Sequence, residues 1–202
     1  MKFAFIGTHG VGKTTLCFEL AALLKKRDRV VEMVHEVARF CPLPINRDTT
    51  TDAQSWILHT EIAAELEAAH KAEIVICDRS VLDNYCYLLQ AGSAPMLEPL
   101  VRSWTKTYDL LIKVPIVSPP GFDGLRDTDV AFQRKIDETI ESVLGDWGFS
   151  AVRLDRARRD TWAADSLESI LPLVGPIQQP LFNEAGGLAV PRTPGEEATK
   201  AV

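Results

Sequence analysis

Short apolar runs alternate with longer amphipathic stretches along most of this chain. The runs predict strands at residues 3–6, 29–35, 73–77, 109–114 and 151–154. Apolar side chains at helical spacing predict helices between them, at residues 15–26, 52–70, 81–90, 95–107, 132–144 and 161–174. Strands that alternate with helices imply a parallel sheet with right-handed crossovers. We therefore predict one domain over residues 1–174, a three-layer α/β/α fold with a five-stranded parallel sheet.

Two segments fall outside this pattern. Residues 115–129 are rich in proline, glycine and aspartate, which predicts a loop without regular structure. Residues 175–202 hold prolines at positions 176, 180, 191 and 194 and a pair of glycines at 186–187. This composition predicts an irregular C-terminal tail that follows the domain.

A complete phosphate-binding motif joins the first strand to the first helix. Residues 7–14 read G-T-H-G-V-G-K-T and match G-x-x-x-x-G-K-[ST] at every fixed position. Glycines let the backbone turn its N–H groups toward phosphate oxygens, and the following helix adds its positive end. Lys13 is expected to reach the β- and γ-phosphates, and the Thr14 hydroxyl to ligate Mg²⁺. The sequence thus predicts a nucleoside-triphosphate site made by Gly7, Thr8, His9, Gly10, Val11, Gly12, Lys13, Thr14 and Thr15.

Composition limits the class of protein. The 202 residues are 46% hydrophobic and 25% charged, which is ordinary for a globular domain. A formal net charge of −6 disfavours a dedicated nucleic-acid binder, because such proteins usually present a basic face to phosphates. The first strand starts almost at the N-terminus and no apolar run approaches membrane-spanning length, so we expect a cytoplasmic protein without a signal peptide or membrane segment.

Residues at the ends of the neighbouring strands decide what a P-loop does with its nucleotide. The carboxyl ends of parallel strands converge on the crevice where ligands bind, which brings Glu36, Asp78 and Arg79 beside the P-loop. Asp78 closes an apolar strand, so we predict that it is a Walker-B carboxylate that holds Mg²⁺. The structural alternative for Asp78 is an N-cap of the helix that begins at Val81.

Two further positions are candidates for the phosphoryl-transfer step. Glu36 and Arg39 are spaced to meet the same ligand, and Glu36 is our candidate for the base that accepts a hydroxyl proton. Arg126 lies in the Pro/Gly-rich loop, where it suits a lid that closes over the phosphates and supplies positive charge. The structural alternatives are a surface ion pair between Glu36 and Arg39 and a solvated charge run around Arg126.

Taken together, these motifs resemble a known family. The P-loop, H-E-V-A-R at 35–39, D-R-S at 78–80 and D-G-L-R-D at 123–127 look like the P-loop kinase-like ATPases related to the nicotinamide-riboside kinase domain of bacterial NAD regulators. The chain is also similar to the thymidylate-kinase and deoxynucleoside-kinase superfamily. Over residues 1–171 the resemblance implies sheet order 2-3-1-4-5, ATP with Mg²⁺, and a nucleoside-like acceptor. It further implies that Glu36 and Arg39 face the acceptor, that Arg79 binds acceptor or phosphate, and that Arg126 acts from the lid.

Three functions remain open at this point. The leading interpretation is a kinase that transfers the γ-phosphoryl of ATP to a hydroxyl of a nucleoside, nucleotide or related small metabolite. A second places that hydroxyl on DNA or RNA, with the basic run at residues 153–159 as a candidate surface. A third is a non-catalytic regulatory module, although the chain lacks the N-K-x-D motif of guanine-specific switches. The sequence leaves the acceptor, the preference for ATP or GTP and the oligomeric state open, with a homodimer as one candidate.

Overall fold

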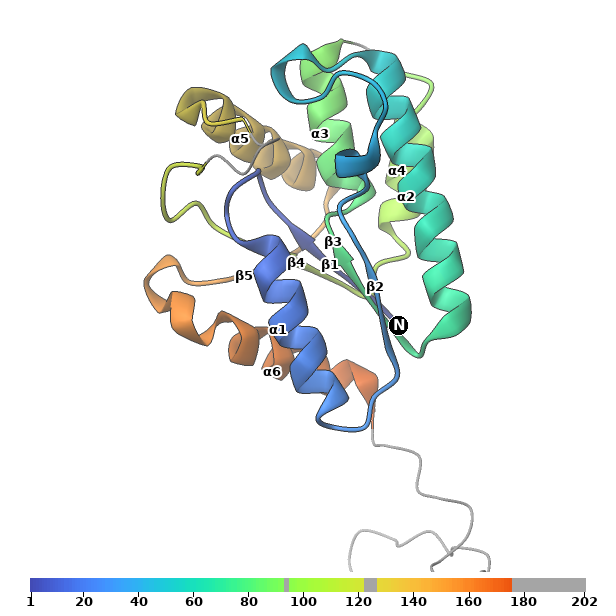
Figure 1. Cartoon of the computed structure of the whole chain (residues 1–202), viewed down its shortest axis with the longest axis vertical. Helices are drawn as coiled ribbons and strands as arrows, with labels where there is room; N and C mark the ends of the chain where they lie inside the picture. Colours follow the sequence, from blue (N-terminus) through green and yellow to red (C-terminus); the bar gives the residue numbers. More distant parts are fainter. Residues whose placement is uncertain (93–94, 122–126, 176–202) are drawn as a thin grey trace, which may run out of the picture.

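The computed structural model describes residues 1–92, 95–121 and 127–175 and has the three-layer α/β/α architecture expected from the sequence (Figure 1). Within these ranges a single parallel sheet is formed by the strands Lys2–Ile6 (β1), Val31–Val34 (β2), Ile74–Asp78 (β3), Leu110–Lys113 (β4) and Val152–Arg153 (β5). Their order across the sheet is β2-β3-β1-β4-β5. The order that the family resemblance implied is therefore confirmed.

The register of the central strands sets the position of the site. Strand β1 lies between β3 and β4, with Phe5 opposite Asp78 on one side and opposite Ile112 on the other. Both β1 and β3 are buried along their whole length, because helices cover the two faces of a parallel sheet. The carboxyl end of β3 consequently lies beside the end of β1, where the P-loop begins.

Helices cover the two faces of the sheet unequally (Figure 1). Helices Lys13–Lys25 (α1) and Trp162–Val174 (α6) pack on one face, around a core that includes Leu20, Leu24 and Ile170. The other face is covered by Thr51–Lys71 (α2), Val81–Ala91 (α3), Glu98–Thr105 (α4) and Val130–Trp147 (α5). Short 3₁₀ helices at Val37–Phe40 (η1), Asn46–Asp48 (η2) and Arg156–Thr161 (η3) follow the ends of β2 and β5.

Local sequence signals account for most helix boundaries. Thr50 is the N-cap of α2, and its hydroxyl accepts a hydrogen bond from the N–H of Ala53 at 3.1 Å. Helix α4 is shorter than predicted and begins at Glu98 rather than at residue 95. Pro99 lies in its first turn, where a proline interrupts no hydrogen bond of the helix because the N–H groups of this turn have no partner within it.

Some predictions fall on parts of the chain that the structure leaves undescribed. Arg126 and the rest of segment 122–126 lie outside the described residues, as do residues 93–94 and 176–202. The division between a domain ending at residue 174 and a C-terminal tail therefore stays a prediction. None of the helices in the described ranges is both long and apolar enough to cross a membrane.

Candidate active site

An open pocket lies at the carboxyl edge of the sheet, the place where ligands bind in parallel α/β folds. It lies between the P-loop, the ends of β2 and β3, and the helices α2 and α3. The predicted site residues in its wall are His9, Gly10, Val11, Gly12, Lys13, Thr14, Thr15, Glu36, Arg39, Asp78 and Arg79. Its remaining wall is formed by Ala38, Ile45, Asn46, Gln54, Ile57, Asn84 and Tyr87.

The P-loop has the backbone shape that a phosphate cradle requires. Gly7 has φ +146°, and a Cβ at this position would lie only 2.8 Å from the carbonyl oxygen of Val114, so a larger residue would collide with the backbone of the next strand. Gly12 has φ +97° and is the N-cap of α1. Because no side chain caps this end of α1, its first N–H groups are free to bind an anion.

The Lys13 side chain folds back into the loop. Its Nζ donates hydrogen bonds to the carbonyl oxygens of Gly7 at 2.6 Å and Thr8 at 2.7 Å. Burial, together with the nearby charge of Arg79, lowers the pKa of Lys13 to about 8. An ammonium group carries three protons, so one remains to be donated to a phosphate oxygen. The geometry fits the role that the motif predicts for this lysine.

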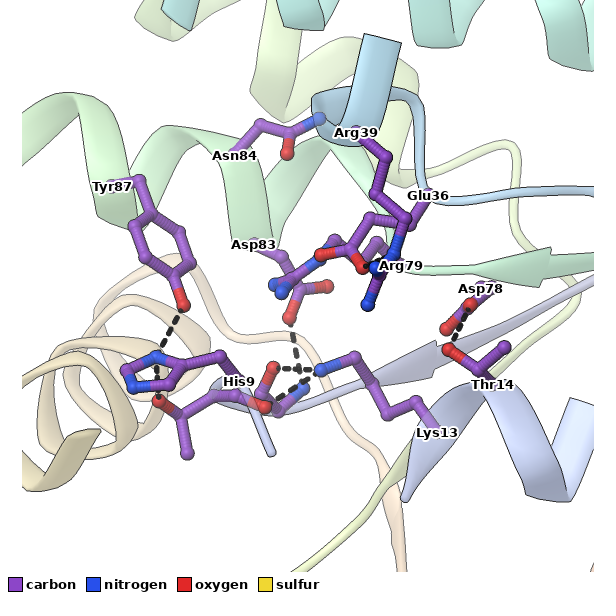
Figure 2. Close-up of polar contacts among 12 residues, drawn as sticks. His9, Lys13, Thr14, Glu36, Arg39, Asp78, Arg79, Asp83, Asn84 and Tyr87 are labelled. Atoms are coloured by element: carbon purple, nitrogen blue, oxygen red, sulfur yellow. Dashed lines mark hydrogen bonds and ion pairs between the residues drawn. The ribbon is translucent and has the colours of Figure 1, made fainter. Parts of the chain in front are cut away.

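Thr14 and Asp78 meet across the end of the sheet (Figure 2). The Thr14 hydroxyl donates to Asp78 Oδ2 at 2.6 Å, and burial raises the pKa of the Asp78 carboxyl. A hydroxyl and a carboxylate are hard oxygen donors that suit Mg²⁺, which usually takes its other ligands from phosphates and water. Among the described residues no group of three or more His, Cys, Asp or Glu side chains could hold a metal by itself. A shared protein–phosphate site therefore fits these residues better than a closed metal cage.

Glu36 holds two arginines in the wall of the pocket. Its carboxylate accepts from Arg79 Nε at 2.5 Å and from Arg39 Nε at 3.0 Å. Burial alone would raise the pKa of Glu36, but the charges of Arg79 and Lys13 outweigh it and lower the pKa to about 2. The ion pair between Glu36 and Arg39 that we considered as a structural alternative is present. It belongs to a larger network that faces the cavity.

The backbone at Arg79 is strained. Its φ of +118° lies in a region that residues with a Cβ rarely adopt, at the turn between β3 and α3. The guanidinium atom Nη1 is buried and has no hydrogen-bond partner in the described part of the chain. A strained residue with an unpaired cationic donor at a pocket wall is typical of a ligand-binding position.

Comparison with known proteins agrees with the fold described above. A family model described as an AAA domain matches residues 2–161. The chain belongs to this AAA domain family. Its fold is similar to that of the deoxyadenosine kinase from M. mycoides, solved with dCMP and a flexible dCDP bound, with a TM-score of 0.58 over 84% of this chain and 98% of the kinase. The two chains are 18% identical, a level at which the likeness shows the fold alone. None of the curated proteins matches the chain significantly.

One structural residue of this AAA domain was not predicted from the sequence. The Asp83 carboxylate is fully buried, and its Oδ2 accepts from the N–H and the hydroxyl of Ser80 at 2.9 and 2.8 Å. The Ser80 hydroxyl accepts in turn from the Asp83 N–H, which completes a capping box at the start of α3. Ser80 therefore caps α3, and the alternative of Asp78 as its N-cap is not observed. The S-x-x-D spacing was the signal that could have shown this.

Four further pocket residues lie on helices α2 and α3, and no sequence motif marked them as site residues. Gln54 and Ile57 reach the cavity from α2, and Asn84 and Tyr87 reach it from α3. A helix places every third or fourth side chain on one face, so the sequence predicts that Asn84 and Tyr87 share a face. Which face turns toward the P-loop depends on how α3 packs, and this is a property of the tertiary structure.

The basic run at residues 153–159, late in the sequence of the AAA domain, is partly neutralised by acidic side chains. Arg153 pairs with Glu141 at 2.7 Å, and Arg158 pairs with Asp165 at 3.0 Å. Arg159 lies instead next to the P-loop, with its Nη2 3.8 Å from the point where a Cβ on Gly12 would stand. Together with Trp162 it lines a second cavity beside the N-terminus of α1. This cavity and the first one share Gly12 and Thr15 in their walls.

Proposed function

We propose that this protein is an ATP- and Mg²⁺-dependent kinase that transfers the γ-phosphoryl group to a hydroxyl of a nucleoside-like small molecule. The observation that carries the proposal is that one pocket contains both the P-loop lysine and the Glu36–Arg79 ion pair. A nucleotide switch needs the phosphate cradle alone. A phosphotransferase also needs a carboxylate and cations on the side from which an acceptor hydroxyl approaches.

The donor side is supported by the P-loop and its surroundings. The N–H groups at the start of α1 and the Lys13 ammonium would bind the β- and γ-phosphates. Thr14 and Asp78 would hold Mg²⁺, which neutralises charge on the phosphate oxygens when it is bound. The second cavity, next to Arg159, adjoins the P-loop at Gly12 and Thr15 and would take the ribose and base of the donor.

The acceptor side is supported by the network around Glu36. With a pKa lowered to about 2, this carboxylate is ionised at neutral pH and is a weak base. A weak base suffices because phosphoryl transfer proceeds through a loose transition state, in which the hydroxyl keeps its proton until late in the reaction. The Arg79 guanidinium, which lines the pocket, would donate to the transferred phosphoryl group, and Arg39 would bind the acceptor. Arg126 remains our predicted lid residue.

The far half of the pocket suits a neutral ring rather than a second phosphate chain. Its wall contains Ile45, Ile57, Gln54, Asn84 and Tyr87, and none of these side chains is charged. Gln54 Oε1 is buried without a hydrogen-bond partner in the described residues. An acceptor with an N–H group on a planar heterocycle would satisfy this atom. The deoxyadenosine kinase with a similar fold and the resemblance to nicotinamide-riboside kinases both support an acceptor of this chemistry.

A screen of acceptors tests the proposed function directly. Purified protein would be incubated with Mg²⁺, ATP and one of a panel of nucleosides, nucleotides, vitamin ribosides and short oligonucleotides, and ADP and the phosphorylated product would be measured. We expect product formation with a nucleoside-like member of the panel and none without Mg²⁺. Transfer only to oligonucleotides would support the nucleic-acid alternative, and ATP binding without transfer to any acceptor would support a regulatory module.

A further inference from the structure

Tyr87 joins the phosphate loop to the acceptor-side arginine. It is only 7% exposed and lines the pocket from α3. Its hydroxyl lies 2.9 Å from Nδ1 of His9, a variable position within the P-loop motif (Figure 2). Neither the motif nor the acceptor-side residues require a tyrosine at this position.

The aromatic face of Tyr87 contacts Arg79. The Arg79 guanidinium carbon lies 5.3 Å from the centre of the Tyr87 ring, within the range of a cation–π interaction. On its other side the guanidinium is held through Nε by Glu36. The ring and the carboxylate together limit how the guanidinium can rotate. Its nitrogen Nη1 is buried without a hydrogen-bond partner in the described residues, and Arg79 as a whole lines the pocket.

His9 gives the tyrosine hydroxyl a fixed partner. The His9 carbonyl oxygen accepts a hydrogen bond from Gln133 Nε2 at 3.0 Å, and the His9 ring lies 5.6 Å from the ring of Phe132. Both contacts come from the first turns of α5, and Phe132 also packs edge-on against Tyr87 at 6.0 Å. The position of the tyrosine ring is therefore set jointly by the P-loop and α5.

We propose that Tyr87 is a positioning residue for phosphoryl transfer. Through its contact with His9, it holds the Arg79 guanidinium at a fixed position relative to the phosphate loop. The inference rests on the proposed kinase function. Tyr87 does not itself exchange a proton or an electron pair in this role. It would keep Arg79 at a fixed place relative to the γ-phosphate. A cation stabilises the charge that develops in the transition state most strongly when its side chain is already in position.

The first experiment compares two tyrosines of the same helix. Tyr87→Phe removes the hydroxyl and keeps the ring, whereas Tyr85→Phe removes a hydroxyl that donates to Glu98 at 3.1 Å, outside the pocket. We expect Tyr87→Phe to lower kcat by about 2- to 13-fold, the range that corresponds to one hydrogen bond, with little change in the Kd for ATP. Tyr85→Phe should leave kcat unchanged. Equal kcat values for Tyr87→Phe and wild type would overturn the proposal.

A double-mutant cycle shows whether Tyr87 acts through Arg79. Arg79→Lys removes the planar guanidinium, so adding Tyr87→Phe to this variant should lower kcat no further. Additive losses would show that Tyr87 contributes independently of Arg79 and would overturn the positioning role. His9→Asn, which keeps a polar atom near the tyrosine hydroxyl, should retain more activity than His9→Ala. Equal losses in these two variants would also contradict the proposal.

A readout without turnover separates this inference from the proposed function. The Arg79 Nε–H signal can be assigned in a ¹⁵N NMR spectrum of wild-type protein by its loss in Arg79→Lys. Tyr87→Phe should shift or broaden this signal, and Tyr85→Phe should not. An unchanged signal would overturn the positioning role even if the enzyme is active. A changed signal in a protein that phosphorylates no acceptor would support the positioning of Arg79 and refute only the kinase function.

Discussion

Asp83 Oδ1 accepts a hydrogen bond from the backbone N–H of Gly7 at 2.8 Å, although 76 positions separate the two residues. The other oxygen of the same carboxylate closes the capping box of α3 through Ser80. One buried carboxylate therefore ties the first residue of the P-loop to the turn that carries Arg79. The P-loop and the β3–α3 turn, which both line the pocket, share this anchor.

Asp83→Ala should destabilise the protein substantially. The substitution removes the Asp83 half of the capping box and leaves the Gly7 N–H buried without a partner, which together cost roughly 2–4 kcal/mol in the free energy of unfolding. Urea denaturation measures this loss. Asp52→Ala provides a matched control, because Asp52 is an exposed aspartate in the first turn of α2. Losses of similar size in the two variants would show that the Asp83 contacts contribute little.

Lys13→Met should be more heat-stable than wild type near neutral pH and inactive in transfer. The wild-type protein keeps a charge at a buried position, where the pKa is lowered from its ordinary 10.5 to about 8. Between these two values the unfolded chain holds a proton that the folded chain has lost, so wild-type stability rises with pH. The advantage of the mutant in Tm should therefore shrink as the pH is raised from about 7 to about 10.

The control for this prediction is Lys25→Met, at an exposed lysine in the last turn of the same helix. Its Tm should differ from that of wild type by the same amount across this pH range. Phosphoryl transfer by Lys13→Met should fall by at least about 10²-fold, the usual cost of removing one preorganised charge donor. If the Tm difference between Lys13→Met and wild type stays constant with pH, the buried charge of Lys13 does not destabilise the folded protein.

Asp78→Asn should raise the Mg²⁺ concentration needed for half-maximal activity by about 10- to 100-fold. The neutral amide keeps the shape of the side chain but attracts the ion far less, and losses of this size follow when metal-binding partners are changed. A Mg²⁺ titration of the initial rate at fixed ATP measures the effect. Asp52→Asn serves as the control, since its side chain is exposed and lies outside the pocket. A wild-type titration curve for Asp78→Asn would remove this residue from the metal site.

Glu36→Gln should lower kcat by roughly 10²–10⁴-fold, the usual range for general-base catalysis, with little change in ATP affinity, because the donor phosphates are bound by the P-loop. Single-turnover kinetics and ATP-binding calorimetry on the same preparations separate the two effects. The control is Glu67→Gln, which removes an exposed glutamate paired with Lys71 at 2.5 Å. Near-normal turnover in Glu36→Gln, with the best acceptor found, would show that this network is structural.

The P-loop and the strand pattern were determined by the sequence alone, because each depends on residues that are adjacent in the chain. The glycines at positions 7 and 12 have the positive φ angles that the motif requires, and Asp78 ends β3 beside the P-loop as its apolar run predicted. Local geometry fixes such features before any packing occurs. The sequence did not determine the first residue of α4. A proline permits a helix to start near it without specifying where the helix begins.

The contacts between distant elements were decided only by the tertiary structure. Glu36 and Arg79 are 43 positions apart, and His9 and Tyr87 are 78 apart, so neither pair follows from local spacing. Each pair forms because β1, β2 and β3 end at one edge of the sheet while α3 turns one particular face toward the P-loop. The rotation of a helix about its axis is set by how its apolar side chains fill the core, and no short stretch of sequence contains that information.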